Sequence, residues 1–213
     1  MGLPRLLAAG AGITLVLGAC GGAGGGHHAA PNPASITTTT GAGSAVHPPS
    51  EFAGRLLQNN ELTGFLITDV SVYRTAGGFV SSEQLSPSAA TAETRMLAGN
   101  GFRVAAKEDL DHQGMAGLSL VERFGSPAAA REALRFYVAK FRRVGGANEF
   151  AFFPVAGVPG AVGFRLGGAG GAGSNVAFAD GDYYYLLGEE GSGPGPQNSL
   201  GAATRRLYHH VHA

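Results

Sequence analysis

The strongest constraint on how this chain can fold is a long uncharged stretch near its start. Residues 21–49 are mostly Gly, Ala, Pro, Ser, Thr and His, with almost nothing large and apolar. Such a stretch cannot bury enough surface to offset the entropy of ordering its backbone. We therefore predict a flexible tether over residues 20–49. Residues 50–213, which hold the aromatic residues and all but one of the charged ones, are predicted to form a single globular domain.

An export signal precedes the tether. Arg5 supplies a positive charge, residues 6–17 form an apolar run interrupted by small residues, and further small residues follow. That order is typical of a secretory signal peptide. The apolar run is shorter than the roughly 20 residues that a membrane-spanning helix needs. We predict that residues 1–19 are removed on export; a short buried helix is the alternative.

The end of this signal contains the only cysteine of the chain, in the sequence Leu17-Gly18-Ala19-Cys20. These four residues resemble the lipobox of bacterial lipoproteins. The resemblance implies that Leu17, Gly18 and Ala19 are recognised by a dedicated signal peptidase, and that the Cys20 thiol carries diacylglycerol. Two or more acyl chains give stable attachment to a membrane. The expected location is therefore the outer face of the cytoplasmic membrane; an ordinary signal peptide with an incidental cysteine is the alternative.

Charge and motifs exclude several function classes. Lys plus Arg equal Asp plus Glu at 15 each, so no net field favours nucleic acid. The chain has no glycine-rich phosphate loop with its Lys-Ser/Thr pair and no Gly-x-Ser-x-Gly elbow between a strand and a helix. Lipidation of Cys20 would remove the only thiol. We expect no nucleic-acid partner, no cofactor and no metal.

Clusters of titratable residues remain as candidates for chemistry. Paired acids can perform acid–base catalysis or bind calcium, yet the acids here fall at predicted turns or a strand end, and we interpret them as solvated. They are Glu108, Asp109 and Asp111; Asp180 and Asp182; and Glu189 and Glu190. His209 and His212 would share a helix face, but a metal site needs a third ligand, for which His112 is the candidate.

Apolar periodicity and turn residues predict an α+β domain. Helices are predicted over residues 51–57, 88–98, 127–144 and 199–210, and strands over 65–74, 102–110, 115–124, 149–155, 161–166, 175–179 and 183–188. The turn Asp180-Gly181-Asp182 predicts a hairpin. Adjacent strands flanked by separate helices favour an antiparallel β-sheet packed by helices in layers, with the helices on one face.

Two aromatic residues are candidates for contact with a ligand or partner. Phe136 projects off the apolar stripe of the helix over 127–144. Residues 183–185 are three consecutive tyrosines on a strand, so alternation turns at least one ring, with Tyr184 as the candidate, away from a core that covers one face. Both could line a groove for a lipid or peptide, although an isolated surface aromatic is common.

The order of elements resembles that of the mycobacterial LpqN-type lipoproteins, whose fold is similar to Mog1 and PsbP. The segments "VPGAVGF" and "NVAFADGDYYYLLG" also resemble parts of uncharacterised actinobacterial lipoproteins. The resemblance implies a fold and no activity. We expect a membrane-anchored, non-enzymatic binding or accessory domain of the cell envelope, with a lipid or an envelope protein as partner. A cell-envelope hydrolase whose site assembles from dispersed residues is the alternative.

Overall fold

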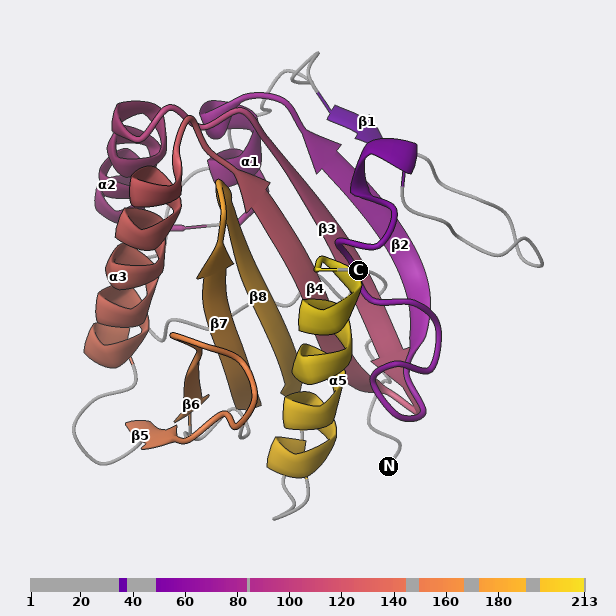
Figure 1. Cartoon of the computed structure of the whole chain (residues 1–213). Helices are drawn as coiled ribbons and strands as arrows, with labels where there is room; N and C mark the ends of the chain where they lie inside the picture. The colour runs from indigo at the N-terminus through magenta and orange to yellow at the C-terminus, as the bar shows by residue number, and fades with distance from the viewer. Residues whose placement is uncertain are drawn as a thin grey trace, which may run out of the picture.

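The computed structural model describes residues 35–37, 49–83, 85–144, 150–166, 173–190 and 196–212. They form an eight-stranded antiparallel sheet in the order β1-β2-β3-β4-β8-β7-β6-β5 (Figure 1). The strands are β1 (Ser35–Thr37), β2 (Leu66–Tyr73), β3 (Val104–His112), β4 (Met115–Arg123), β5 (Phe150–Phe153), β6 (Val162–Leu166), β7 (Gly173–Asp180) and β8 (Tyr183–Glu190). The helices are α1 (Ala76–Ser82), α2 (Pro87–Gly99), α3 (Pro127–Val144) and α5 (Pro196–His210), with a 3-10 turn η1 (Ser50–Phe52).

Both faces of the sheet are buried. Helices α1, α2 and α3 pack on one face over a core that includes Tyr184, Leu120 and Phe164. Helix α5 and residues 50–65 pack on the other, over Tyr185 and Val121. Successive strand residues point to opposite faces, so the neighbouring tyrosines belong to different cores. The antiparallel α+β sheet in layers is confirmed, whereas the expectation of helices on one face is wrong.

The uninterrupted apolar run of β8 is the signal for this two-sided burial. A strand with one solvated face alternates apolar and polar residues, and a strand buried on both faces does not. Residues 184–188 of β8 are all buried. Strand β8 lies in the middle of the sheet, between β4 and β7, where both α3 and α5 contact it.

Most predicted elements are confirmed, one predicted helix is shorter than expected, and helix α1 and strand β1 were not predicted. The predicted helix over 51–57 is limited to η1, because Gly54 has a φ of 75° and ends the helical path. Helix α1 was not predicted, because Gly77 and Gly78 lower helix propensity. Its start is fixed by Thr75, whose hydroxyl accepts a hydrogen bond from the Gly78 amide at 3.1 Å.

The predicted tether contributes one short strand. Strand β1 falls within residues 20–49 and pairs antiparallel with the end of β2, Ser35 opposite Tyr73 and Thr37 opposite Ser71. Ile and Thr favour an extended backbone, and β2 offers unpaired backbone groups at that edge. The sheet thus reaches into residues 20–49, for which no regular structure was predicted.

Candidate functional site

A chain of ionisable side chains is buried where α2, α3 and β4 meet. The Tyr137 hydroxyl of α3 lies 2.9 Å from Glu122 Oε1 on β4 and 3.2 Å from Glu93 Oε1 on α2. Lys140 Nζ lies 2.5 Å from the other Glu93 oxygen, and Glu93 is 1% exposed. We call these four residues the buried network. It joins α2 to α3 and joins both helices to the sheet.

A proton on Glu122 lets the Tyr137 hydroxyl bond both carboxyls, while Glu122 Oε2 is buried without a hydrogen-bond partner among the described residues. Burial raises the pKa of Glu122 well above its usual value, which favours the neutral carboxyl. A phenol has a single hydrogen, so one of the two carboxyls beside Tyr137 must itself carry a proton for both contacts to be hydrogen bonds. A neutral Glu122 donates to Tyr137, which donates to Glu93, and Lys140 balances the Glu93 charge.

Further ionisable residues surround the buried network on the same face. Lys107 Nζ lies 3.2 Å from Asp109 Oδ1 on β3. Burial raises the pKa of Asp109 and of Glu83, which caps the end of α1. Desolvation is the largest single influence on Lys107 and lowers its pKa, but Asp109, Tyr73 and Glu83 together outweigh it and raise the pKa of this lysine. On this face Asp109 and Glu93 thus each lie beside a lysine.

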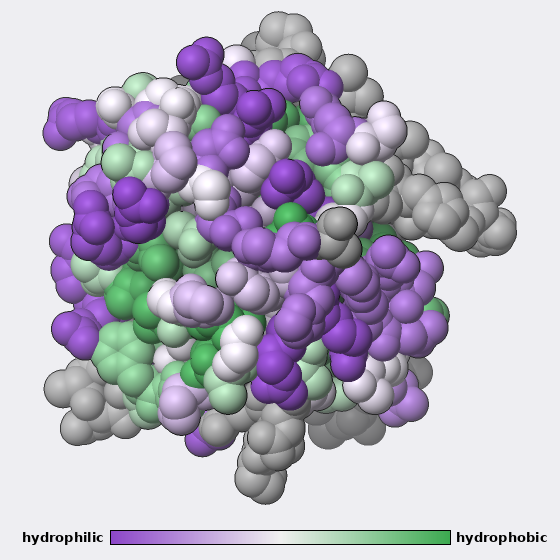
Figure 2. Space-filling view, in the orientation of Figure 1, coloured by the Kyte–Doolittle hydropathy of each residue, from purple (hydrophilic) through white to green (hydrophobic). Residues whose placement is uncertain are grey.

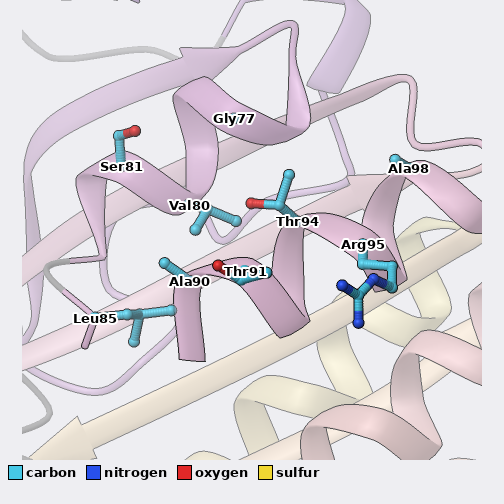
Figure 3. A pocket seen from close by; sticks show the side chains of 9 residues that line it. All are labelled: Gly77, Val80, Ser81, Leu85, Ala90, Thr91, Thr94, Arg95 and Ala98. Carbon is cyan, nitrogen blue, oxygen red and sulfur yellow. The ribbon is translucent and has the colours of Figure 1, made fainter. Parts of the chain in front are cut away.

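An open groove of about 530 Å³ lies between helices α1 and α2, on the same side of the sheet as the buried network. Figure 3 shows Val80, Leu85 and Ala90 gathered towards one end and Arg95 at the other, with the hydroxyls of Thr91 and Thr94 between the helices. The lining residues are Gly77, Val80, Ser81, Leu85, Ala90, Thr91, Thr94, Arg95 and Ala98. The groove thus has an apolar end, a hydroxyl-lined middle and a cationic end.

The groove exists because its walls lack side chains that would fill it. A Cβ atom added to Gly77 would meet nothing within 4 Å. Within the part of the chain that the structure describes, the exposed Arg95 guanidinium forms no ion pair. Glu93, Thr94 and Arg95 are consecutive on α2, so the buried network that holds Glu93 also fixes the two groove residues that follow it.

The two predicted contact residues occupy different environments. Tyr184 is fully buried and stacks on Tyr137, with ring centroids 4.9 Å apart. Because helices cover both faces of the sheet, the expectation of an outward-facing ring at Tyr184 is wrong. Phe136 is half-buried and packs edge-on against Tyr137 at 5.6 Å. Its role as a contact stays a prediction, and neither residue lines the groove.

The predicted acidic clusters do not converge on one site. Glu108 faces the α5 side, Asp109 faces the α1–α3 side, and Asp111 is exposed, because side chains alternate along β3. Asp182 pairs with Arg123 at 3.0 Å and Asp180 lies 3.3 Å from His212. Glu189 is buried beside Ser199, and burial raises its pKa to about 7.

Glu108 is the most isolated acid of the α5 side. Its side chain is fully buried, and burial raises its pKa to about 8. The Ser119 hydroxyl and the Leu57 amide partly offset this rise, although neither approaches the carboxyl closely enough for a normal hydrogen bond. Leu57 N–H instead donates to Ser119 Oγ at 3.1 Å. Glu108 is therefore largely protonated at neutral pH.

The histidines also contact separate partners. His210 Nδ1 lies 3.3 Å from Glu61 Oε1, and His112 Nδ1 lies 2.7 Å from the Gly64 carbonyl oxygen. Among the described residues, no group of three or more His, Cys, Asp and Glu side chains is placed to hold a metal ion. Leu17, Gly18, Ala19 and Cys20 lie outside the described residues.

The sequence did not predict the buried network or the position of Arg95. Tyr137 falls on the apolar stripe of the helix over 127–144, which indicates a core residue, and Arg95 carries no motif. The sequence signal for the buried network is Glu122. This charged residue follows Leu120 and Val121 in a strand whose residues are largely buried. A charged residue in such a strand needs a partner, but its partners come from α2 and α3 and cannot be identified without the fold.

Replacing Lys140 by Met should lower the free energy of unfolding by about 2–3 kcal/mol, because Glu93 is left buried without its cation. Guanidinium denaturation measures this loss. A double variant that also carries Glu93→Leu should recover most of it, because no charge is then left unpaired. Strictly additive losses in the double variant would contradict the coupling of the two residues.

Glu108 should make the protein less stable as pH rises. Its pKa is raised in the folded state, so between about pH 4.5 and pH 8 the folded chain holds a proton that the unfolded chain has released. Stability is therefore greatest below this window and falls through it by about 1 kcal/mol per pH unit for this group. Glu108→Gln should flatten the profile measured by denaturation, whereas Asp111→Asn, an exposed position on the same strand, should not. An unchanged slope in Glu108→Gln would refute the assignment.

Comparison with known proteins leaves the family of the chain open. No family model and no curated protein matches it. Among solved structures, the extracellular domain of PknH from Mycobacterium tuberculosis is similar, with a TM-score of 0.48 and 15% sequence identity over 80% of this chain and 100% of that chain. At this TM-score and identity, the likeness carries no conclusion about the function of this chain.

Proposed function

We propose that the chain is a lipid-anchored, non-enzymatic binding domain of the cell envelope, and that the groove between α1 and α2 is its ligand site. The observation that carries the proposal is the composition of the groove. An apolar end formed by Val80, Leu85 and Ala90 is continuous with two hydroxyls and with the exposed guanidinium of Arg95. The groove volume of about 530 Å³ is in the range typical of small-molecule sites.

The chemistry of the groove matches a single-chain anionic lipid such as a fatty acid. A guanidinium binds a carboxylate with two parallel hydrogen bonds, which an alcohol cannot reproduce. Thr91 and Thr94 can donate to the same group or to a bound water. An acyl chain lying along Val80 and Leu85 is removed from water at one wall, which contributes roughly 25 cal/mol for each Å² buried.

One feature favours this groove over the space between the sheet and the helices as the ligand site, and another favours binding over catalysis. Both faces of the sheet are occupied by packed side chains, including Phe164, Tyr184 and Tyr185, which leave no room there for an acyl chain. The buried acids Glu93, Glu108 and Glu122 are paired with a cation or enclosed by packed side chains. A substrate at the surface does not reach the enclosed carboxyls, which favours binding over catalysis.

The lipobox-like sequence supports the anchoring part of the proposal. Leu17, Gly18, Ala19 and Cys20 stand directly after an apolar run and before residues 21–49. Among the helices that the structure describes, none combines the length and the hydropathy needed to cross a bilayer. In this proposal the acyl groups on Cys20 hold the binding domain at the membrane.

Cys20→Ser should abolish incorporation of labelled palmitate, because a hydroxyl does not replace the thiolate that carries the thioether. Expression in an actinobacterial host with labelled palmitate, followed by membrane fractionation, measures the effect. The variant should also leave the membrane fraction or retain residues 1–19. Unchanged labelling would refute the lipobox assignment without affecting the groove.

Gly77→Leu should weaken binding of a fluorescent fatty acid about tenfold or more, because the new side chain fills the open groove. The measurement is a fluorescence titration of the chain carrying Cys20→Ser, so that its own acyl chains cannot compete. Arg95→Gln should weaken binding of the acid but not of the matching fatty alcohol.

Gly99→Leu is the matched control for Gly77→Leu. Gly99 is also a helical glycine with nothing within 4 Å of an added Cβ, but it does not line the groove. Both substitutions raise helix propensity, so neither should unfold the chain. Equal weakening in the two variants, or equal affinity of the parent for the acid and the alcohol, would contradict the proposed site.

A further inference from the structure

The outward face of α3 concentrates positive charge, although the net charge of the whole chain is zero. Arg131, Arg135, Arg142 and Arg143 are all exposed on this helix, and Glu132 is the one exposed acid among them. The formal net charge of the whole chain is zero. The acids that balance these arginines therefore lie elsewhere, and the molecule is electrically polarised.

Three of the arginines lie on the same side of α3 because of their spacing along the helix. Positions 131, 135 and 142 fall within about 40° of one another on a helix of 3.6 residues per turn, and the stretch from 131 to 143 is about 18 Å long. Lys140 is on the opposite side, in the buried network. Among described residues, Arg131, Arg142 and Arg143 form no ion pair, whereas Arg135 pairs with Glu132.

An exposed aromatic ring lies at the end of this row. Phe152 of the edge strand β5 is 46% exposed, and the Arg142 guanidinium is stacked over its ring at 4.7 Å. Figure 2 shows strongly hydrophilic side chains along the position of α3 next to an apolar area of surface. Cations beside an exposed large apolar ring are the features by which proteins bind the surface of an anionic bilayer.

We propose that Arg131, Arg142, Arg143 and Phe152 form a membrane-contact surface that lies on anionic phospholipid headgroups. The orientation rests on the proposed anchoring through Cys20, because residues 21–34 span at most about 50 Å when fully extended and β1 begins at Ser35. The bilayer is then always within reach of α3. Each arginine near an anionic surface strengthens binding about fivefold, which is weak alone but effective once the domain is tethered.

Vesicle co-sedimentation of the full chain carrying Cys20→Ser tests the surface without any acyl group. The vesicles contain phosphatidylcholine with or without phosphatidylglycerol. The chain should bind the anionic vesicles more tightly, and raising the salt from about 50 mM to about 500 mM should weaken that binding. Arg131→Gln with Arg142→Gln should reduce binding about thirtyfold, and Phe152→Ser should reduce it at both salt concentrations.

Arg103→Gln with Arg206→Gln is the control of equal charge, since both residues are exposed and lie outside α3. It should retain most of the binding, and all variants should keep the parental melting temperature. Equal loss in the two double variants would show that net charge alone matters and would overturn the proposal. Absence of any preference for anionic vesicles would also overturn it, and would point to an acidic protein partner. Neither outcome depends on whether Cys20 is acylated.

Discussion

The ionic contact between Lys140 and Glu93 is the interaction on which the arrangement of helices α2 and α3 depends. The buried residues of α3 include the small side chains of Ala130 and Ala133. Such a surface is smooth and fixes the sliding of one helix over another poorly. Lys140 and Tyr137 on α3 reach the same Glu93 on α2. The polar contact therefore specifies a register that apolar packing alone would leave loose.

Buried acids have different partners on the two faces of the sheet. On the α1–α3 face, Glu93 forms an ion pair with Lys140, and Glu122 contacts the hydroxyl of Tyr137. On the α5 face, Glu108 forms no ion pair within the described part of the chain, and burial raises its pKa to about 8. A paired acid holds elements together through its charge, whereas an unpaired acid does so only while it is protonated. The packing of residues 50–65 over Glu108 therefore depends on the protonation of this acid.

The local elements of this fold could be predicted from the sequence because their signals are local. Helix α3 follows from its period of apolar residues, and the β7–β8 hairpin follows from Asp180-Gly181-Asp182, where Gly181 adopts a φ of 54°. The predicted helix at 51–57 failed at a single residue, Gly54. Helix α1 was missed because its glycines obscure a helix whose stability comes from the burial of Phe79 and Val80.

The candidate site could not be predicted, because it is assembled by tertiary contacts. Arg95 is an ordinary solvent-exposed residue until α1 is placed opposite it, and the apolar end of the groove combines Val80 of α1 with Ala90 of α2. Of the residues in the buried network and the groove, only Glu122 carried a sequence signal for a buried polar contact. Tyr184 illustrates the reverse case, because its predicted exposure depended on one uncovered face of the sheet, and α3 covers that face.

Helix α3 connects the two proposed surfaces. Its inward side holds α2 through the buried network, and its outward side carries the arginines assigned to the bilayer. Because α1, α2 and α3 lie side by side on one face of the sheet (Figure 1), a domain resting on α3 would place the groove beside the headgroups. A single-chain anionic lipid leaving the membrane then reaches Arg95 over a short distance. The same rigid contact that fixes α2 on α3 would thus fix the height of the groove above the bilayer.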